Sequence, residues 1–264
     1  VFADNGADCF AVSSLDEGVE LRRYAGITKD IFILGHTDGR RTEELLAYHI
    51  EPAVFNLKNA EYYSEEASRL GQTLQVHIAI DTGMSRVGFL PSEETIEAIK
   101  KIASLPRIEI RGIFTHFATA DEKDKTFTHE QFKRFMWVCT RLENEGVHIP
   151  IRHCCNSAAT LEMPQYHLDM VRPGIIQYGC APSPDVSLEG FDFRPVMSLR
   201  CCAAHIKLID KGATVSYGRH FTCDQRRKIA AMPMDICVSC PARWMYCSMD
   251  IGYLRLETSA WTSA

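Results

Sequence analysis

Short apolar runs rich in β-branched residues alternate with longer amphipathic stretches over the first two thirds of the chain. Each such run predicts a β-strand, and each amphipathic stretch a helix. The predicted strands are CFAVS (9–13), IFILG (31–35), AVFN (53–56), LQVHIAID (74–81), IEIRGIFTHF (108–117), PIRHCC (150–155) and MVRPGIIQYG (170–179). Because helices separate the strands, the pattern predicts parallel βαβ units with right-handed crossovers.

The first helix has a recognisable start signal. Ser14 precedes the apolar positions Leu15, Val19 and Leu21, and Glu17 follows Ser14 by three residues. A serine hydroxyl can accept from a backbone N–H of the first turn, while the glutamate reaches back to a preceding N–H. The sequence therefore predicts a capping box at Ser14.

Repeated parallel units leave two architectures open, a doubly wound sheet and a barrel. Seven strands are one short of a closed (β/α)8 barrel, and the chain begins at Val1 rather than Met, in what reads as a helix-to-strand connection. We expect an α/β fold of the (β/α)8 TIM-barrel type, with its first strand missing, followed by a partial C-terminal β domain. The chain is thus expected to be a fragment.

The pattern changes after Pro195. The segments VMSLRCCAAHIKLI (196–209) and RKIAAMPM (227–234) are β-rich and no long helical stretch follows. We therefore expect a barrel domain over residues 1–190 and a β domain over residues 191–264, the latter disrupted after about residue 233.

Composition narrows the function classes. The chain has 264 residues, of which 46% are hydrophobic and 24% charged, and no apolar run is long enough to span a bilayer. A net charge of -5 offers no basic field for nucleic acid. We expect neither a membrane nor a nucleic-acid partner, and small-molecule chemistry becomes the better interpretation.

The 11 cysteines do not indicate a disulfide framework, because the chain is long and has no signal peptide. We expect a reducing cytoplasm. Cys154 and Cys155 stand in an apolar run, as small buried hydrophobes commonly do. Cys237 and Cys240 form a CxxC, but no second pair follows at zinc-site spacing, so no metal site is assigned.

Polar residues follow several predicted strands directly. Arg86 lies in DTGMSRVGF (81–89), His116 ends its strand after Thr115, Ser157 follows Asn156, and Arg172 precedes Pro173 and Gly174. Barrel enzymes place their reactive groups at these carboxyl ends, so the side chains are expected to converge on one mouth. Taken singly, His116 could be a structural histidine and Arg172 a surface or ion-pair residue.

A phosphate site is one interpretation of the last two predicted strands. The Ser157 hydroxyl and the backbone N–H groups at Gly174 and Ile175 are donors that suit a phosphate monoester. Phosphate sites on such barrels often follow the last two strands. Ordinary helix capping and turn chemistry explain the same residues equally well.

Five ordered motifs together resemble the alanine racemase family. They are DTGMSRVGF (81–89), GIFTHFATADEKD (112–124), NSAATLEMP (156–164), MVRPGIIQYG (170–179) and VSYGRHFT (215–222). The segment FAVSSLDEGVELRRYAGI (10–27) is also similar, and the resemblance covers roughly residues 1–233.

The resemblance implies a cofactor, pyridoxal 5'-phosphate, and roles for individual residues. His116 would pack against the pyridine ring, and Arg172 would donate to the ring nitrogen. Ser157 and the backbone at Gly174 and Ile175 would bind the phosphate, and Arg86 would reach the phenolic oxygen. An arginine partner leaves the ring nitrogen unprotonated, which weakens the electron sink and favours proton return over side reactions.

The resemblance also implies an activity and a context. The family interconverts L- and D-alanine by removing the α-proton on one face and returning a proton on the other, with a lysine and a tyrosine as the two bases. It implies alanine as the small-molecule partner, a homodimer with shared active sites, and a bacterial cytoplasmic enzyme that feeds cell-wall synthesis.

The chain departs from the family pattern at its catalytic bases. Nothing matches the Schiff-base lysine motif, which should precede Val1, and MDICVSCPARWMYCSMD (234–250) replaces the expected tyrosine motif. A reading-frame error after Pro233 is our hypothesis for this change; Tyr253 has the wrong spacing to serve. Ala79 stands where many relatives have a lysine that, carbamylated, braces the arginine matching Arg86.

We therefore assign no catalytic residue and expect the chain to be inactive as it stands. Two alternatives stay open from the residues, a serine-preferring racemase and a non-catalytic fragment that binds pyridoxal phosphate. A barrel decarboxylase of the same cofactor class is disfavoured, because an acidic residue would be expected in place of Arg172.

Overall fold

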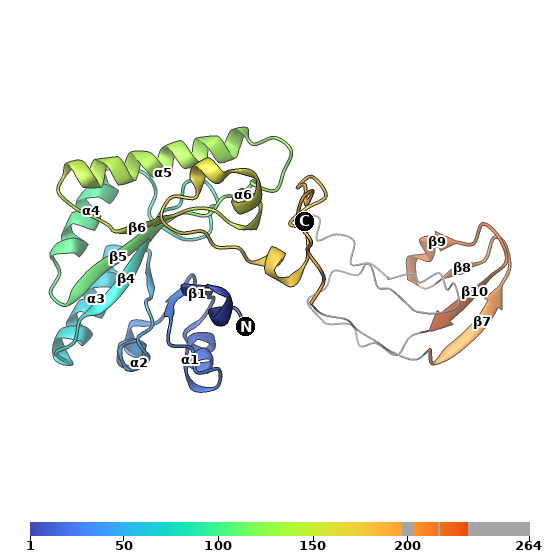
Figure 1. Ribbon diagram of the computed structural model, residues 1–264, viewed down its shortest axis with the longest axis horizontal. Helices are drawn as coiled ribbons and strands as arrows, with labels where there is room; N and C mark the ends of the chain where they lie inside the picture. The colour runs from blue at the N-terminus through green and yellow to red at the C-terminus, as the bar shows by residue number, and fades with distance from the viewer. Residues whose placement is uncertain (197–202, 216, 232–264) are drawn as a thin grey trace. The chain divides into compact units, whose positions relative to one another are not determined.

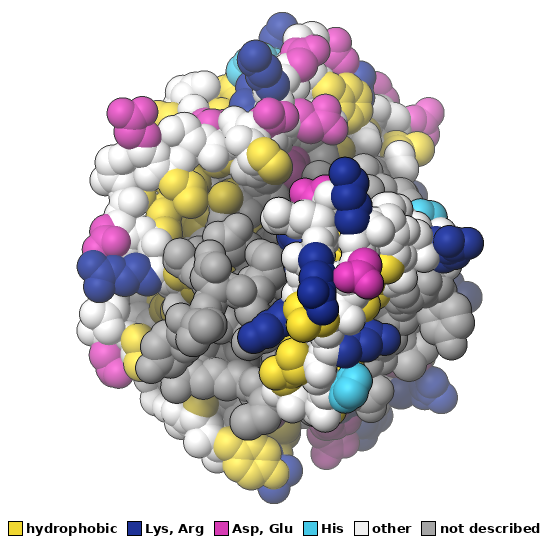
Figure 2. Space-filling model, turned by 90° about the vertical axis from the view of Figure 1, so that its right-hand side faces the viewer, with side chains coloured by type: hydrophobic (Ala, Val, Ile, Leu, Met, Phe, Trp, Pro, Cys, Tyr) yellow, Lys and Arg dark blue, Asp and Glu magenta, His cyan; other side chains and the backbone are white. Residues whose placement is uncertain are grey.

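The computed structural model describes residues 1–196, 203–215 and 217–231. The chain divides into two compact units, Val1–Arg194 and Pro195–Ala264. No described helix is long and apolar enough to cross a membrane. Basic and acidic side chains both occur on the face shown in Figure 2.

The first unit alternates strands and helices (Figure 1). Its strands are β1 (Cys9–Val12), β2 (Asp30–Ile33), β3 (Ala53–Val54), β4 (Leu74–Ala79), β5 (Ile108–Phe114) and β6 (Ile151–His153). Its helices are α1 (Leu15–Arg23), α2 (Thr42–Tyr48), α3 (Leu57–Arg69), α4 (Glu93–Ser104), α5 (Thr126–Asn144) and α6 (Ser157–Glu162). Four short 3-10 helices accompany them, at Ala3–Asn5, Gly39–Arg41, Pro164–Tyr166 and Ile175–Tyr178.

All strand pairs of this unit are parallel, and neighbours in space are neighbours in sequence. β1 pairs with β2, and β3, β4, β5 and β6 form one sheet in that order. A parallel bridge from Phe32 to Glu51 continues the series from β2 towards β3. Strand order in a doubly wound sheet reverses at a switch point, whereas a barrel runs in sequence order. The order therefore identifies a partial TIM-type barrel, as predicted.

One predicted strand is wrong. Of residues 170–179, only Met170 pairs as a strand residue, in a parallel bridge with His153. Pro173 has no N–H to donate to a ladder, and the chain turns into the 3-10 helix Ile175–Tyr178. The apolar run thus supplies one sheet contact and then a helical turn.

The capping box at α1 forms with a shift of one residue. Ser14 Oγ accepts from Glu17 N at 3.3 Å, as predicted. The Glu17 carboxylate accepts from the backbone N–H and the hydroxyl of Ser13, both at 2.8 Å, rather than from Ser14. Because the Ser14 hydroxyl and the Glu17 carboxylate each accept from a backbone N–H at the start of α1, the helix begins where the sequence indicated.

The two faces of the sheet differ in character. Towards the helices, strand residues such as Val76, Ile78 and Ile113 join a continuous apolar core with Ile99 of α4 and Phe135 of α5. Cys154 and Cys155 are fully buried in that core, which confirms their interpretation as small hydrophobes.

The opposite face of the strands carries a cluster of rings. Phe32 stacks on His77 with ring centroids 4.8 Å apart, and Phe114 stacks on His153 at 5.1 Å. Ala53 and Ala79 pack beside Phe114. In a barrel this face points inward, so the interior of the barrel is partly polar.

The second unit contains two antiparallel strand pairs among its described residues. β7 (His205–Ile209) pairs with β10 (Arg227–Ala231), and β8 (Thr214–Val215) pairs with β9 (Phe221–Thr222). This β-type structure was expected after Pro195. The predicted disruption after residue 233, the CxxC at Cys237 and Cys240, and Tyr253 lie outside the described residues.

Candidate functional site

The carboxyl ends of β5 and β6 meet around Arg172. Its Nη2 donates to Thr115 O at 2.8 Å and to Cys154 O at 3.3 Å, so the side chain links the loops after β5 and β6. Its backbone N–H donates to Cys155 O at 3.0 Å. The predicted convergence of these segments is therefore present in the fold.

The Arg172 guanidinium is held as a cation in a partly buried place. Nη1 lies 2.8 Å from His153 Nδ1, and Cζ lies 5.6 Å from the centroid of the Phe114 ring. Desolvation lowers the pKa of Arg172 to about 10, which still leaves the group charged at neutral pH. Its Nε is buried and has no hydrogen-bond partner among the described residues. One N–H thus stays available to a ligand.

His116 presents a neutral imidazole near that cation. Burial, followed by the charges of Arg172 and Arg86, lowers the pKa of His116 to about 3. Its Nδ1 is buried without a partner in the described part of the chain. A ring in this state can pack against another ring, donate one hydrogen bond and accept another, but it carries no charge at neutral pH.

The lowered pKa of His116 should be visible in the pH dependence of stability. Between the ordinary pKa of 6.5 and the folded value of about 3, the unfolded chain binds a proton that the folded chain does not. The His116 contribution is therefore complete above pH 6.5 and is lost as the pH falls towards 3. We expect His116→Gln to flatten this acid limb in urea unfolding. An NMR titration of the His116 ring with a midpoint near 6.5 would contradict the expectation.

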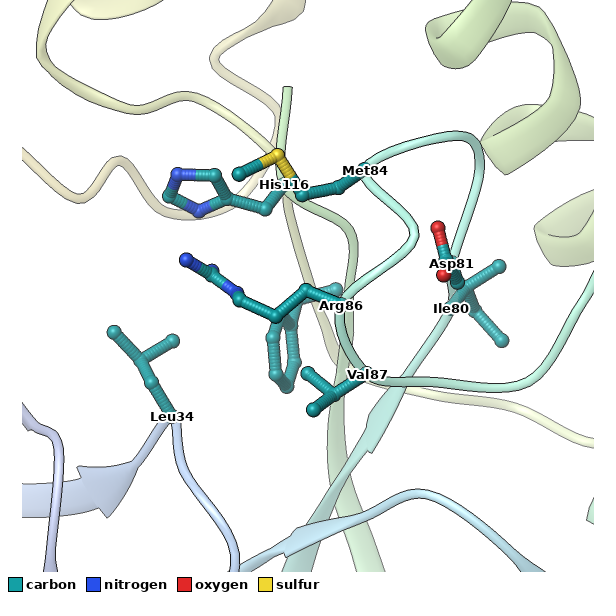
Figure 3. A pocket seen from close by; sticks show the side chains of 8 residues that line it. Leu34, Ile80, Asp81, Met84, Arg86, Val87 and His116 are labelled. Atoms are coloured by element: carbon teal, nitrogen blue, oxygen red, sulfur yellow. The ribbon is translucent and has the colours of Figure 1, made fainter. Parts of the chain in front are cut away.

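Arg86 is presented by a loop built on Asp81. Asp81 Oδ1 accepts from the N–H groups of Gly83, at 3.0 Å, and Ser85, at 2.9 Å, and Ser85 takes a left-handed φ of 55°. This loop turns Arg86 towards the space in front of His116, above Leu34 at the end of β2, while Asp81 points away (Figure 3). Arg86, His116 and Leu34 line one pocket. Its other lining residues are Ile80, Asp81, Met84, Val87 and Phe114.

The Arg86 guanidinium makes no hydrogen bond or ion pair with the described residues, so it faces the pocket as an uncompensated cation. Ala79 is buried against Ala53 and Phe114, and no polar group of the described chain braces Arg86 from that position. The family's carbamylated-lysine brace has no counterpart there.

Gln131 of α5 fixes the loops that carry these groups. Its buried amide donates to Thr82 Oγ1 and to His116 O, both at 3.2 Å, and accepts from Ala118 N at 2.9 Å. Thr82 and Thr115 share a hydrogen bond of 2.7 Å between their hydroxyls. The sequence did not point to Gln131, because its partners are distant in sequence.

The predicted phosphate residues also lie together. Ser157 Oγ accepts from the Gly174 N–H at 2.8 Å, and Ser157 is the first residue of α6. Ile175 begins a 3-10 helix that follows Gly174, and it is exposed. The first N–H groups of a helix have no partner within it, so donors gather beside the Ser157 hydroxyl.

The sequence did not indicate a buried hydrogen-bond chain behind Arg172. His153 Nε2 lies 3.0 Å from His77 Nδ1, and His77 Nε2 lies 2.7 Å from Glu51 Oε2. All three side chains are buried. Both histidines lie within predicted strands, but nothing in the sequence indicated that they contact each other.

Residues 1–182 match the family described as "Alanine racemase, N-terminal domain". The alanine racemase of Clostridium tetani is 47% identical over 234 residues, which are 89% of this chain and 60% of that protein. Among solved structures, the alanine racemase of Clostridium difficile 630 superposes with a TM-score of 0.76 at 39% identity, covering 87% of this chain and 60% of that one.

A solved histidine racemase from Leuconostoc mesenteroides superposes with a TM-score of 0.69 at 26% identity, covering 88% of this chain and 62% of that one. The chain thus spans about 60% of the length of the relatives it matches. With a family match over residues 1–182 and close relatives over most of its length, this chain belongs to the alanine racemase family.

Proposed function

We propose that this chain carries the pyridoxal-phosphate-binding barrel of an enzyme that interconverts L- and D-alanine. Residues 1–190 form the barrel in this proposal, and residues 191–264 belong to a C-terminal β domain. The observation that supports it best is the set of unused polar groups at the barrel mouth. Arg172 Nε and His116 Nδ1 are buried without partners among the described residues, and Arg86 is an unpaired cation beside them.

These groups fit the cofactor. The Nε–H of Arg172 would donate to the pyridine nitrogen, and the neutral His116 ring would pack against the pyridine. Arg86 would meet the phenolic oxygen, and Ser157, Gly174 and Ile175 would hold the phosphate. When bound, pyridoxal phosphate supplies the electron sink that makes the α-proton of an amino acid acidic.

The residues of this chain would act by binding the cofactor and by keeping its ring nitrogen unprotonated. A guanidinium with a pKa of about 10 stays protonated and cannot give its proton to the ring nitrogen. The apolar side chains of Leu34, Val87 and Phe114 line the space that Arg86 and His116 face. No residue of the chain is assigned as lysine or tyrosine base, and we expect no turnover from these 264 residues alone.

The alternative substrates differ only in the amino acid. A serine-preferring racemase would use the same cofactor contacts, and the histidine racemase among the structural neighbours has the same fold. We propose alanine because relatives that are 45% and 47% identical to this chain are alanine racemases. A homodimer and a bacterial cytoplasmic location belong to the same proposal.

A titration of the purified chain with pyridoxal phosphate tests the proposal. We expect saturable binding in absorbance, no covalent fixation of the cofactor to a lysine by borohydride, and no alanine racemisation. The absence of saturable binding would contradict the proposed site. Borohydride fixation together with racemisation would support the enzyme class but overturn the expectation of inactivity.

Ser157→Ala should weaken the binding of pyridoxal phosphate. The variant removes the hydroxyl proposed to donate to the phosphate, together with the acceptor that orients the Gly174 N–H, so we expect the dissociation constant to rise about tenfold. Ser104→Ala is the matched control, because its exposed hydroxyl donates only to Lys101 O on α4. Equal affinities in the two variants would exclude Ser157 from the phosphate site.

A further inference from the structure

We infer that Glu51 is a positioning residue for Arg172, acting as the anionic end of a buried hydrogen-bond chain that runs through His77 and His153. The four groups come from separate parts of the barrel. Glu51 precedes β3, His77 lies in β4, His153 ends β6, and Arg172 follows the Met170 bridge. Their successive contacts measure 2.7, 3.0 and 2.8 Å.

The chemistry of the donors fixes the direction of the whole chain. A guanidinium only donates, so His153 Nδ1 must accept from Arg172. A neutral His153 then carries its proton on Nε2 and donates to His77 Nδ1. His77 in turn carries its proton on Nε2 and donates to the Glu51 carboxylate. Each imidazole is therefore held in a single tautomer.

The groups of the hydrogen-bond chain that ends at the Glu51 carboxylate are buried. His153 is 0% exposed, His77 1% and Glu51 7%, so little solvent reaches the three groups. Burial and the nearby Arg172 charge hold the pKa of His153 well below its usual range, which keeps it neutral. The chain then contains one cation and one anion separated by two neutral rings. Glu51 therefore reaches Arg172 only through the two rings, and Arg22 is a second cation near its carboxylate.

The strand between the two histidines is built to let them meet. Gly112 of β5 pairs with His77 on one side and Ile151 on the other. A Cβ at Gly112 would lie 2.3 Å from His77 Nδ1, the atom that accepts from His153. The absence of a side chain at this position opens the space for a contact across an intervening strand.

The hydrogen-bond chain constrains one edge of the Arg172 guanidinium and leaves another edge for a ligand. Nη1 is committed to His153 and Nη2 to two carbonyls, while Nε has no partner among the described residues. The consequence for the cofactor rests on the proposed function, because Nε is the group proposed to meet the pyridine nitrogen. The hydrogen-bond chain itself can be tested without any cofactor.

The test is a nitrogen-15 NMR study of the histidine rings and of the Arg172 guanidinium in the full chain without cofactor. We expect His77 and His153 each to show a protonated Nε2 and an unprotonated Nδ1. Glu51→Gln keeps an acceptor and removes its charge. In this variant the His77 Nε2 proton should move upfield, and smaller shifts in the same direction should reach His153 and Arg172.

Glu51→Leu removes the acceptor, and it should accelerate hydrogen exchange of the Arg172 Nη protons at least about tenfold, a factor that corresponds to about 1.4 kcal/mol. His129 is the internal control, since its Nδ1 contacts Tyr166 Oη at 2.6 Å and takes no part in the hydrogen-bond chain. If Glu51→Leu fails to fold, Glu51→Gln decides the matter alone.

Two results would overturn the inference. One is an Nδ1–H tautomer at either His77 or His153 in the unmodified chain. The other is a response to Glu51→Gln that stops at His77 or that extends equally to His129. Failure of the proposed function would instead appear as absent binding of pyridoxal phosphate while the tautomers and the propagated shifts remain.

Discussion

Gly112→Ala is expected to lower the free energy of unfolding by about 2–4 kcal/mol, because its Cβ would displace the His77 ring from His153. The added carbon would lie 2.3 Å from His77 Nδ1, 2.5 Å from Cε1 of the same ring and 3.1 Å from Ile151 O. Backbone of β6 on one side and the stacked Phe32 ring on the other leave the imidazole little room to move. Urea unfolding followed by circular dichroism measures the change.

Gly174→Ala provides the matched control for this substitution. A Cβ at Gly174 would meet only Ser157 Oγ, at an ordinary distance of 3.8 Å, so stability should change by less than about 0.5 kcal/mol. Equal stabilities of the two alanine variants would mean that the His77 and His153 rings do not occupy the space above Gly112. A large loss at both positions would instead indicate a general intolerance of these segments.

Arg172→Met should cost both stability and cofactor binding. Methionine has a side chain of comparable reach and loses every donor, which leaves His153 Nδ1 and Thr115 O without their partner and ends the hydrogen-bond chain from Glu51 at His153. We expect the free energy of unfolding to fall by about 3 kcal/mol and saturable binding of pyridoxal phosphate to disappear. Urea unfolding and the absorbance titration measure the two effects separately.

Arg141→Met is the control for the loss of an arginine. Arg141 forms a solvent-exposed ion pair with Glu93 at 2.9 Å on the surface of α5, and such pairs contribute about 0–1 kcal/mol. If Arg172→Met were no more destabilising than Arg141→Met, the contacts around Arg172 would contribute little to the fold. If the Arg172 variant retained full cofactor affinity, the proposed role of its Nε would be wrong.

The strand prediction succeeded where the signal was local. The apolar runs at 74–81 and 108–117 contain β4 and β5, and the run at 31–35 covers β2 from its second residue, because the largely buried strands of a parallel sheet are rich in apolar residues whatever their partners are. The run at 170–179 failed as a strand because Pro173 stops the ladder after one bridge. An apolar run can also serve a buried turn, and only the pairing distinguishes the two.

The parallel βαβ pattern, the residues at the strand ends and, through the motifs, the family could be predicted from the sequence. These features depend on residue type and spacing along one segment. The meeting of His77 and His153 across Gly112, and the role of Glu51 at the end of the hydrogen-bond chain to Arg172, could not be predicted in this way.

The register of the sheet explains this difference. A register shift between Val76 and His77 places Gly112 of β5 opposite His77, and a slip of one residue would turn a side chain to the other face. Such a register depends on how separate strands pack together, so no single stretch of sequence contains it.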